Sequence, residues 1–137
     1  MDNKVIKSAV RRKYPAVAID ESLEKAIQIM GEANSSALVV KVDEDLVGIV
    51  TISDIMQSLS EGDDLGETKV SSFMTKCDLI SSGGTRNPCA QLDENQDVLS
   101  AIKVMHEGGM NHLLVSGSDG KPVGMVSSLE IIKLLAS

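Results

Sequence analysis

The chain has 137 residues, a formal net charge of −7, 42% hydrophobic residues and 24% charged residues, enough for one compact domain or two small packed halves. Tyr14 and Phe73 are its only aromatic residues and Arg11, Arg12 and Lys13 form its largest basic cluster, so we expect no nucleic-acid partner. Without an apolar run of membrane-spanning length or a signal-peptide core, we expect a cytoplasmic protein with no membrane partner.

Hydrophobic periodicity and turn residues predict the elements of the first half. In chain order, these are an amphipathic helix at 5–12, a strand at 16–19, a helix from Leu23, strands at 37–42 and 46–50, and a helix at 52–59. Residues 61–68 are acidic and contain glycine, which is typical of a linker.

The second half repeats the same order of elements. Its periodicity and turn residues predict a helix at 70–74, a strand at 90–93, a helix from Val98, strands at 113–116 and 122–126, and a helix at 128–136. Residues 23–40 align with 98–115, and 47–59 align with 123–135. We therefore predict an α+β fold of two β-α-β-β-α units, at 1–60 and 69–137, with an inserted loop at 77–89 that has no counterpart.

One short motif closes each copy, where a strand turns into a helix. The first copy has Thr51 and Asp54 three residues apart, and the second has Ser127 and Glu130. This spacing is typical of a helix capping box, which Glu130 fits better than the shorter Asp54. The same geometry also suits a ligand, because helix amides and a hydroxyl bind phosphate and a carboxylate accepts from ribose hydroxyls. Both interpretations stay open.

The doubled unit resembles a tandem pair of CBS domains. The resemblance rests on GIVTISDI and GMVSSLEI, on the helices LEKAIQIM and VLSAIKVM, and on HLLV at 112–115. It implies two pseudo-symmetric units packed sheet to sheet, with two clefts that bind an adenosine-containing ligand such as AMP, ADP, ATP, an NAD-type or an S-adenosylmethionine-type molecule. It implies no resident cofactor.

The resemblance also implies which residues bind the ligand. Phosphate and ribose would contact Thr51 and Asp54 in one cleft, and Ser127 and Glu130 in the other. Adenine would lie against Ala16, Val17 and Ile49, or against Ala90, Gln91 and Met125.

His112 stands where related proteins that bind several phosphates often carry a basic residue. It is either a phosphate ligand whose charge depends on its surroundings or a partly buried histidine satisfied by backbone. Glu130 is longer than the usual aspartate, so we expect the Asp54 cleft to be the better ribose site.

The helices at 52–59 and 128–136 are apolar around more than one face. The resemblance explains this as a homodimer interface, which we favour over burial of these residues within the domain itself. We expect a regulatory module without an effector domain in its own chain that signals ligand occupancy to a partner protein. The alternative is a ligand-free dimerisation or scaffolding module.

An enzyme and a metal site are both disfavoured by the sequence. It shows no nucleophile–base pair, and its cysteines and histidines lack metal-ligand spacing. Cys77 and Cys89 are either inert thiols, which we favour, or a disulfide that closes the loop at 77–89.

Overall fold

The computed structural model describes residues 4–76, 91–120 and 122–137. The chain forms two compact units, which we name by the repeat that each contains. The first-repeat unit is Pro15–Cys89, and the second-repeat unit joins Met1–Tyr14 to Ala90–Ser137. The loop at 77–89, with Cys77 and Cys89, lies outside the described residues.

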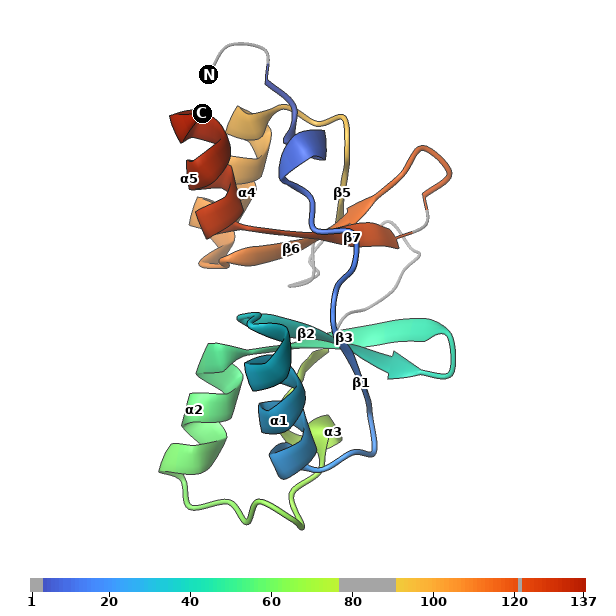
Figure 1. Cartoon of the computed structure of the whole chain (residues 1–137), viewed down its shortest axis with the longest axis vertical. Coiled ribbons are helices and arrows are strands. Elements are labelled where there is room, and N and C mark those ends of the chain that lie inside the picture. The colour runs from blue at the N-terminus through green and yellow to red at the C-terminus, as the bar shows by residue number, and fades with distance from the viewer. Residues whose placement is uncertain (1–3, 77–90, 121) are drawn as a thin grey trace. The chain divides into compact units, whose positions relative to one another are not determined.

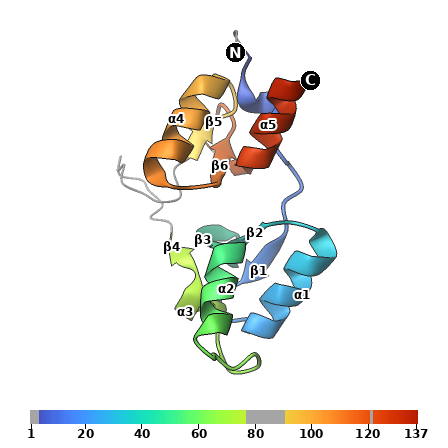
Figure 2. The ribbon, with the colours of Figure 1, turned by 90° about the vertical axis from the view of Figure 1, so that its left-hand side faces the viewer.

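The first-repeat unit is a four-stranded sheet with its helices on one face (Figure 1). Its elements are β1 (Ala16–Ala18), α1 (Leu23–Ala33), β2 (Ala37–Val42), β3 (Asp45–Thr51), α2 (Ile52–Ser60), α3 (Val70–Phe73) and β4 (Thr75–Lys76). The sheet order is β1-β2-β3-β4, with β1 parallel to β2 and the other pairs antiparallel. Figure 2 shows α1 and α2 side by side over this sheet.

The described part of the second-repeat unit has a three-stranded sheet and three helices. Its elements are the 3-10 helix η1 (Ile6–Ala9), β5 (Gln91–Asp93), α4 (Val98–Gly108), β6 (His112–Ser116), β7 (Pro122–Ser127) and α5 (Ser128–Ala136). The β-α-β-β-α order that the sequence predicts is therefore confirmed in both copies, and the fold is α+β.

The two copies use equivalent helix caps. Ser22 caps α1 and Asp97 caps α4, each accepting a hydrogen bond from the amide three residues later. Asn34 and Gly109 end the same two helices in the left-handed conformation. The caps thus specify where the first long helix of each copy begins and ends.

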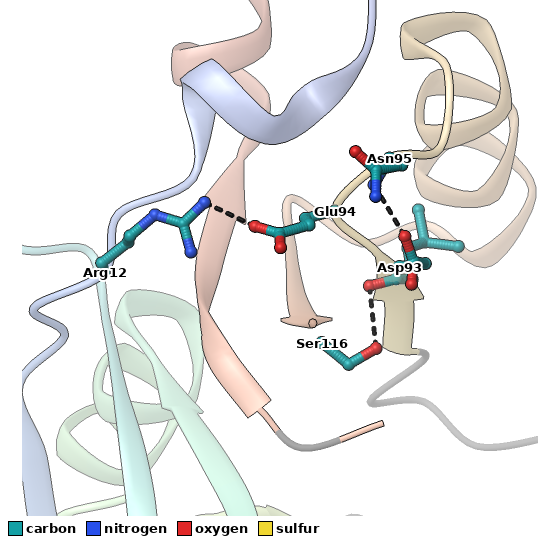
Figure 3. A network of polar contacts seen from close by, with 6 residues as sticks. Arg12, Asp93, Glu94, Asn95 and Ser116 are labelled. Atoms are coloured by element: carbon teal, nitrogen blue, oxygen red, sulfur yellow. Dashed lines mark hydrogen bonds and ion pairs between the residues drawn. The ribbon is translucent and has the colours of Figure 1, made fainter. Parts of the chain in front are cut away.

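The N-terminal segment belongs to the second-repeat unit, although it precedes the first repeat. Ile6 is fully buried in that unit's core, and its amide donates to the carbonyl of Gln96. Arg11 forms a bridge to Met125, and Arg12 forms an ion pair of 2.5 Å with Glu94 (Figure 3). The predicted amphipathic helix at 5–12 is one turn of 3-10 helix followed by extended chain.

The expected linker at 61–68 is an ordered connection inside the first-repeat unit. The Asp64 carboxylate accepts hydrogen bonds from two backbone amides that follow it. The carbonyl of Thr68 accepts from the amide of Leu23 at the start of α1. The segment therefore joins α2 to α3, and α3, which we expected to open the second copy, packs its buried Val70 into the first-repeat core. The expected boundaries follow the order of the repeats in the sequence. In the compact units, the segment that precedes each repeat belongs instead to the unit of the other repeat.

Candidate functional site

Thr51 and Asp54 form a complete capping box at the start of α2. The Thr51 hydroxyl accepts from the Asp54 amide at 3.2 Å, and the Asp54 carboxylate accepts from the Thr51 amide at 3.0 Å. Both residues are half-buried. The expectation that aspartate suits the box less well is wrong here, because its short arm reaches the Thr51 amide.

Ser127 and Glu130 make only half of this arrangement. The Ser127 hydroxyl accepts from the Glu130 amide at 3.1 Å, while a Glu130 carboxylate oxygen lies 3.8 Å from the Lys133 ammonium. The longer glutamate side chain thus turns along the helix instead of back to the cap. The capping box that we expected at Ser127 and Glu130 is not completed.

Thr75 is part of the Asp54 site, and the sequence analysis missed it. Its hydroxyl lies 3.3 and 3.4 Å from the two carboxylate oxygens of Asp54, and it donates to this carboxylate. The residue reaches the site because β4 pairs with β3, which places Thr75 opposite Ile49. Two residues of extended chain carry no periodic signal, so only the structure identifies this partner.

The glycine of each motif makes room for the chain's own backbone. A Cβ on Gly48 would lie 2.8 Å from the carbonyl oxygen of Thr75, and one on Gly124 would lie 3.0 Å from the carbonyl carbon of Arg11. The contact with Thr75 and a still closer one between Gly124 and the carbonyl oxygen of Arg11 are shorter than real Cβ atoms show. The glycine thus admits the segment that pairs with β3 or with β7.

Two of the three apolar candidates of the first-repeat unit, Ala16 and Ile49, share a row across the sheet. Ala16 pairs with Val39, Val39 with Ile49, and Ile49 with Thr75. Side chains alternate along a strand, so this row lies on the sheet face away from the helix-side core. Val17 belongs to that core and is 3% exposed, so only its backbone could contact a ligand.

The second-repeat unit has an equivalent row. Gln91 pairs with Leu114, Leu114 with Met125, and Met125 bridges to Arg11. Met125 and Leu114 lie outside the helix-side core, as Ile49 and Val39 do in the other unit. Ala90 lies outside the described residues.

His112 begins β6 and pairs with Ser127 across the β6–β7 ladder. Burial lowers the pKa of this histidine below its ordinary value, because desolvation disfavours the charged imidazolium. His112 is thus neutral at pH 7, close to the start of α5. The structure places it beside the second motif, where a neutral imidazole offers one donor and one acceptor.

Each unit therefore brings its motif residues to one strand-to-helix junction, with Thr51 and Asp54 in the first-repeat unit and Ser127, Glu130 and the paired His112 in the second. The first-repeat site combines a held carboxylate with two hydroxyls, which suits hydrogen-bond recognition of a diol. Among residues 4–76, 91–120 and 122–137 there is no group of three acidic, histidine or cysteine side chains that could hold a metal ion. None of the helices in these described ranges is long and apolar enough to cross a bilayer.

Comparison with known proteins gives the same family for both repeats. The CBS domain profile matches residues 6–61 and 70–137. A crystal structure of a CBS domain superposes with a TM-score of 0.82 and 28% identity, covering 98% of both chains. The CBS domain pair of a protein crystallised with 5′-methylthioadenosine and S-adenosyl-L-methionine has a TM-score of 0.74 at 22% identity, over 97% of this chain and 96% of that one, a likeness of fold.

Among the curated relatives, an uncharacterized 33.4 kDa protein of Thermofilum pendens is 30% identical over 115 residues, which are 84% of this chain. The chain spans 38%, 27% and 17% of the lengths of three such relatives. The family match covers nearly the whole chain, in two copies that coincide with the two repeats. The chain belongs to the CBS domain family and carries the domain as a tandem pair.

Proposed function

We propose that this CBS pair is a regulatory module, not a catalyst, that binds an adenosine-containing ligand and signals its occupancy to a partner protein. The observation that carries the proposal is the Asp54 carboxylate, fixed by the Thr51 amide and the Thr75 hydroxyl at a helix N-terminus. The match to the CBS domain family supports it.

The chemistry of Asp54 fits a ribose. An ionised carboxylate has about four acceptor positions, and Thr51 and Thr75 occupy only part of that capacity. The remaining lone pairs can accept from two neighbouring hydroxyls. Because the carboxylate is already held, little side-chain entropy is lost when the ligand binds.

The half-buried Ala16 supplies apolar side-chain surface for an adenine ring, whereas Val39 and Ile49 are 0% and 4% exposed and, like Val17, would contact it through their backbone. Ala16, Val39 and Ile49 come from three neighbouring strands on the same sheet face as Thr51. The neighbour that binds 5′-methylthioadenosine and S-adenosyl-L-methionine supports this ligand class, since both contain adenosine.

We propose a second, weaker ribose site in the other unit. It would use Ser127 and Glu130, with the backbone of Met125 and Gln91 for the adenine, since Met125 is only 4% exposed, and His112 beside them. Glu130 is not held by its own cap, so its carboxylate must be ordered when a ligand binds. This extra entropy cost favours the Asp54 site.

We also propose that the module is a homodimer. Ile52, Met56 and Leu59 on α2 are 45%, 58% and 40% exposed, and Leu129 and Ile132 on α5 are each 59% exposed. Three apolar residues at helical spacing on one face are more than a solvated helix needs. Burial of these faces against a second copy would remove them from water.

A ligand-free scaffold is the second candidate, and the complete capping box favours it. The hydrogen bonds of Thr51 and Asp54 give both residues a structural role that needs no ligand. Under this alternative, the loss of Asp54 would cost stability and nothing else.

Calorimetric titration with AMP, ADP, ATP, NAD and S-adenosylmethionine separates the two candidates. The wild-type protein is compared with Asp54→Ala and with Ser22→Ala, which removes the N-cap of another helix in the same unit. We expect saturable binding that Asp54→Ala abolishes and Ser22→Ala retains. A folded protein that gives no heat with any of the five ligands would support the scaffold.

A further inference from the structure

The two units carry very different charges. Residues 15–76 of the first-repeat unit contain twelve Asp and Glu residues and four Lys residues, a formal charge of −8. Residues 4–14, 91–120 and 122–137 of the second-repeat unit contain seven Lys and Arg residues and six Asp and Glu residues, a formal charge of +1 with histidine neutral. The negative charge of the described chain is therefore concentrated in the first-repeat unit.

The N-terminal segment causes this difference. Residues 4–13 contain five Lys and Arg residues and no Asp or Glu. The segment lies beside α5, because η1 packs against this helix (Figure 2) and the Lys4 ammonium donates to the carbonyl of Leu134 in its last turn. Lys7 on η1 and Lys133 on α5 are both exposed. The surroundings of α5 thus include a basic segment that precedes the first repeat in the sequence.

The surroundings of α2 are acidic. No Lys or Arg occurs between Lys41 and Lys69, whereas this stretch contains eight Asp and Glu residues. Four of them follow the C-terminal end of α2 directly, namely Glu61, Asp63, Asp64 and Glu67. The Ser58 hydroxyl donates to the Asp63 carboxylate at 2.6 Å, which holds this acidic turn against the end of the helix. With nine residues, α2 is about 14 Å long, little more than the screening length of about 10 Å.

The proposed homodimer would bury the apolar faces of α2 and α5, and charge decides which faces meet. Burial of apolar surface is non-directional, so it favours every pairing of these faces alike. Packing α2 against α2 would bring together two units of charge −8, which repel each other. Packing α2 against α5 would bring a unit of charge −8 to one of charge +1, with the acidic end of α2 close to the basic segment beside α5.

We propose that α2 of one copy packs against α5 of a second copy, so that each contact in the homodimer joins a first-repeat unit to a second-repeat unit. A two-fold dimer makes this contact twice, and both exposed apolar faces of each copy are then covered. The inference rests on the homodimer of the proposed function and adds which faces meet.

Engineered disulfides test the pairing of the faces. Met56 and Ile132 are equivalent in the repeat, and they are 58% and 59% exposed. Met56→Cys, Ile132→Cys and the double variant are made with Cys77 and Cys89, the only native cysteines, replaced by serine. After mild oxidation we expect disulfide-linked dimers of the double variant and of neither single variant, because a disulfide needs the two Cβ atoms about 4 Å apart.

Linked dimers of either single variant would show that like faces meet, and they would overturn the inference. The absence of linked dimers in all three samples would also overturn it, since these faces would then belong to a different partner or to none. Thermal melts of each variant confirm that it is folded.

Charge reversal is an independent measurement of the same contact. Sedimentation gives the dimer Kd of the wild-type protein, of Glu61→Lys with Glu67→Lys, and of the control Glu61→Asp with Glu67→Asp, which keeps both charges. Both glutamates are exposed. The two lysines should weaken the dimer about two- to fivefold, with a smaller effect at high salt, and the control should match the wild type.

A tighter dimer in the lysine variant is the result expected if α2 met α2, because the repulsion would fall. That result, or an unchanged Kd, would overturn the inference. A monomeric wild-type protein would overturn the inference and the proposed homodimer together. Calorimetric binding of an adenosine ligand by that monomer would still leave the ligand-binding part of the proposed function standing.

Discussion

Replacement of Gly124 by alanine should destabilise the second-repeat unit. The added Cβ would lie 2.8 Å from a methyl carbon of Val10 and 3.0 Å from the carbonyl carbon of Arg11. A backbone carbonyl cannot rotate away as a side chain can, so the N-terminal segment must move off β7. That movement weakens both backbone hydrogen bonds between Arg11 and Met125.

The cost can be worked out from these contacts. Two hydrogen bonds are worth about 1 kcal/mol each, and partial uncovering of Val10 and the buried Ile6 adds about 1–2 kcal/mol. Alanine offsets about 0.5–1 kcal/mol of this, because it restricts the unfolded chain more than glycine. The net loss in the free energy of unfolding should be about 2–3.5 kcal/mol.

Two other glycines provide matched controls. Gly48→Ala faces one carbonyl oxygen, of Thr75, and the flexible side chain of Met74, so we expect a smaller loss of about 1 kcal/mol. Gly31→Ala, in α1, meets nothing within 4 Å, and it should stabilise the first-repeat unit by about 0.5–1 kcal/mol.

Urea unfolding followed by far-UV circular dichroism measures the three changes, and hydrogen exchange assigns each to a unit. Faster exchange in Gly124→Ala should be confined to residues 4–14 and 91–137. Wild-type stability in Gly124→Ala, or a loss no larger than that of Gly48→Ala, would refute the argument from close backbone approach.

Three further predictions concern the cap, the N-terminal segment and pH. Thr51→Ala should cost about 1 kcal/mol of stability in urea unfolding, and Thr51→Ser should restore most of it, because serine keeps the capping oxygen. Ile6→Ala should cost about 2–5 kcal/mol and accelerate hydrogen exchange in α4 and α5, not in α1 and α2; the reverse pattern would contradict the unit assignment. Burial lowers the pKa of His112, so the unfolded state binds more protons than the folded state at acidic pH. Stability should therefore fall as pH drops below about 6.5. Thermal melts at pH 7.5 and 5.5 measure this loss of stability, which His112→Gln should reduce.

The repeat and its periodicity predicted most of the fold. Apolar spacing from Leu23 and Val98 located α1 and α4, and β-rich runs located both hairpins within one residue of β2, β3, β6 and β7. These elements are long enough to show a period, and each is seen twice. Local patterns of this kind are sufficient to predict an element where its packing agrees with its intrinsic propensity.

Pairing between distant segments could not be predicted in the same way. β4 has two residues, and the bridge at Arg11 has one, so neither carries a periodic signal. The exchange of leading segments between the units depends on which core accepts Ile6 or Val70. Both residues are apolar, and hydrophobicity alone does not choose between two similar cores.

The sequence located the motif of the candidate site but not the contacts within it. The motif at Thr51 and Asp54 was identified, yet the better cap was assigned to Glu130. Side-chain length favoured glutamate, whereas the local backbone decides which carboxylate reaches its own cap. Thr75 entered the site only through tertiary pairing.

The exchanged segments also determine which pieces of this protein can be produced separately. A fragment cut at residue 60 would keep β3 but lose Thr75 and Lys76, which pair with it. The exposed amides and carbonyls of that strand would then offer a template for intermolecular strand pairing and aggregation. A fragment of residues 15–76 keeps its own protecting strand and the buried Val70. Division of the chain between its duplicated sequences would leave both sheets open, because each repeat pairs with a segment that lies next to the other repeat in the sequence.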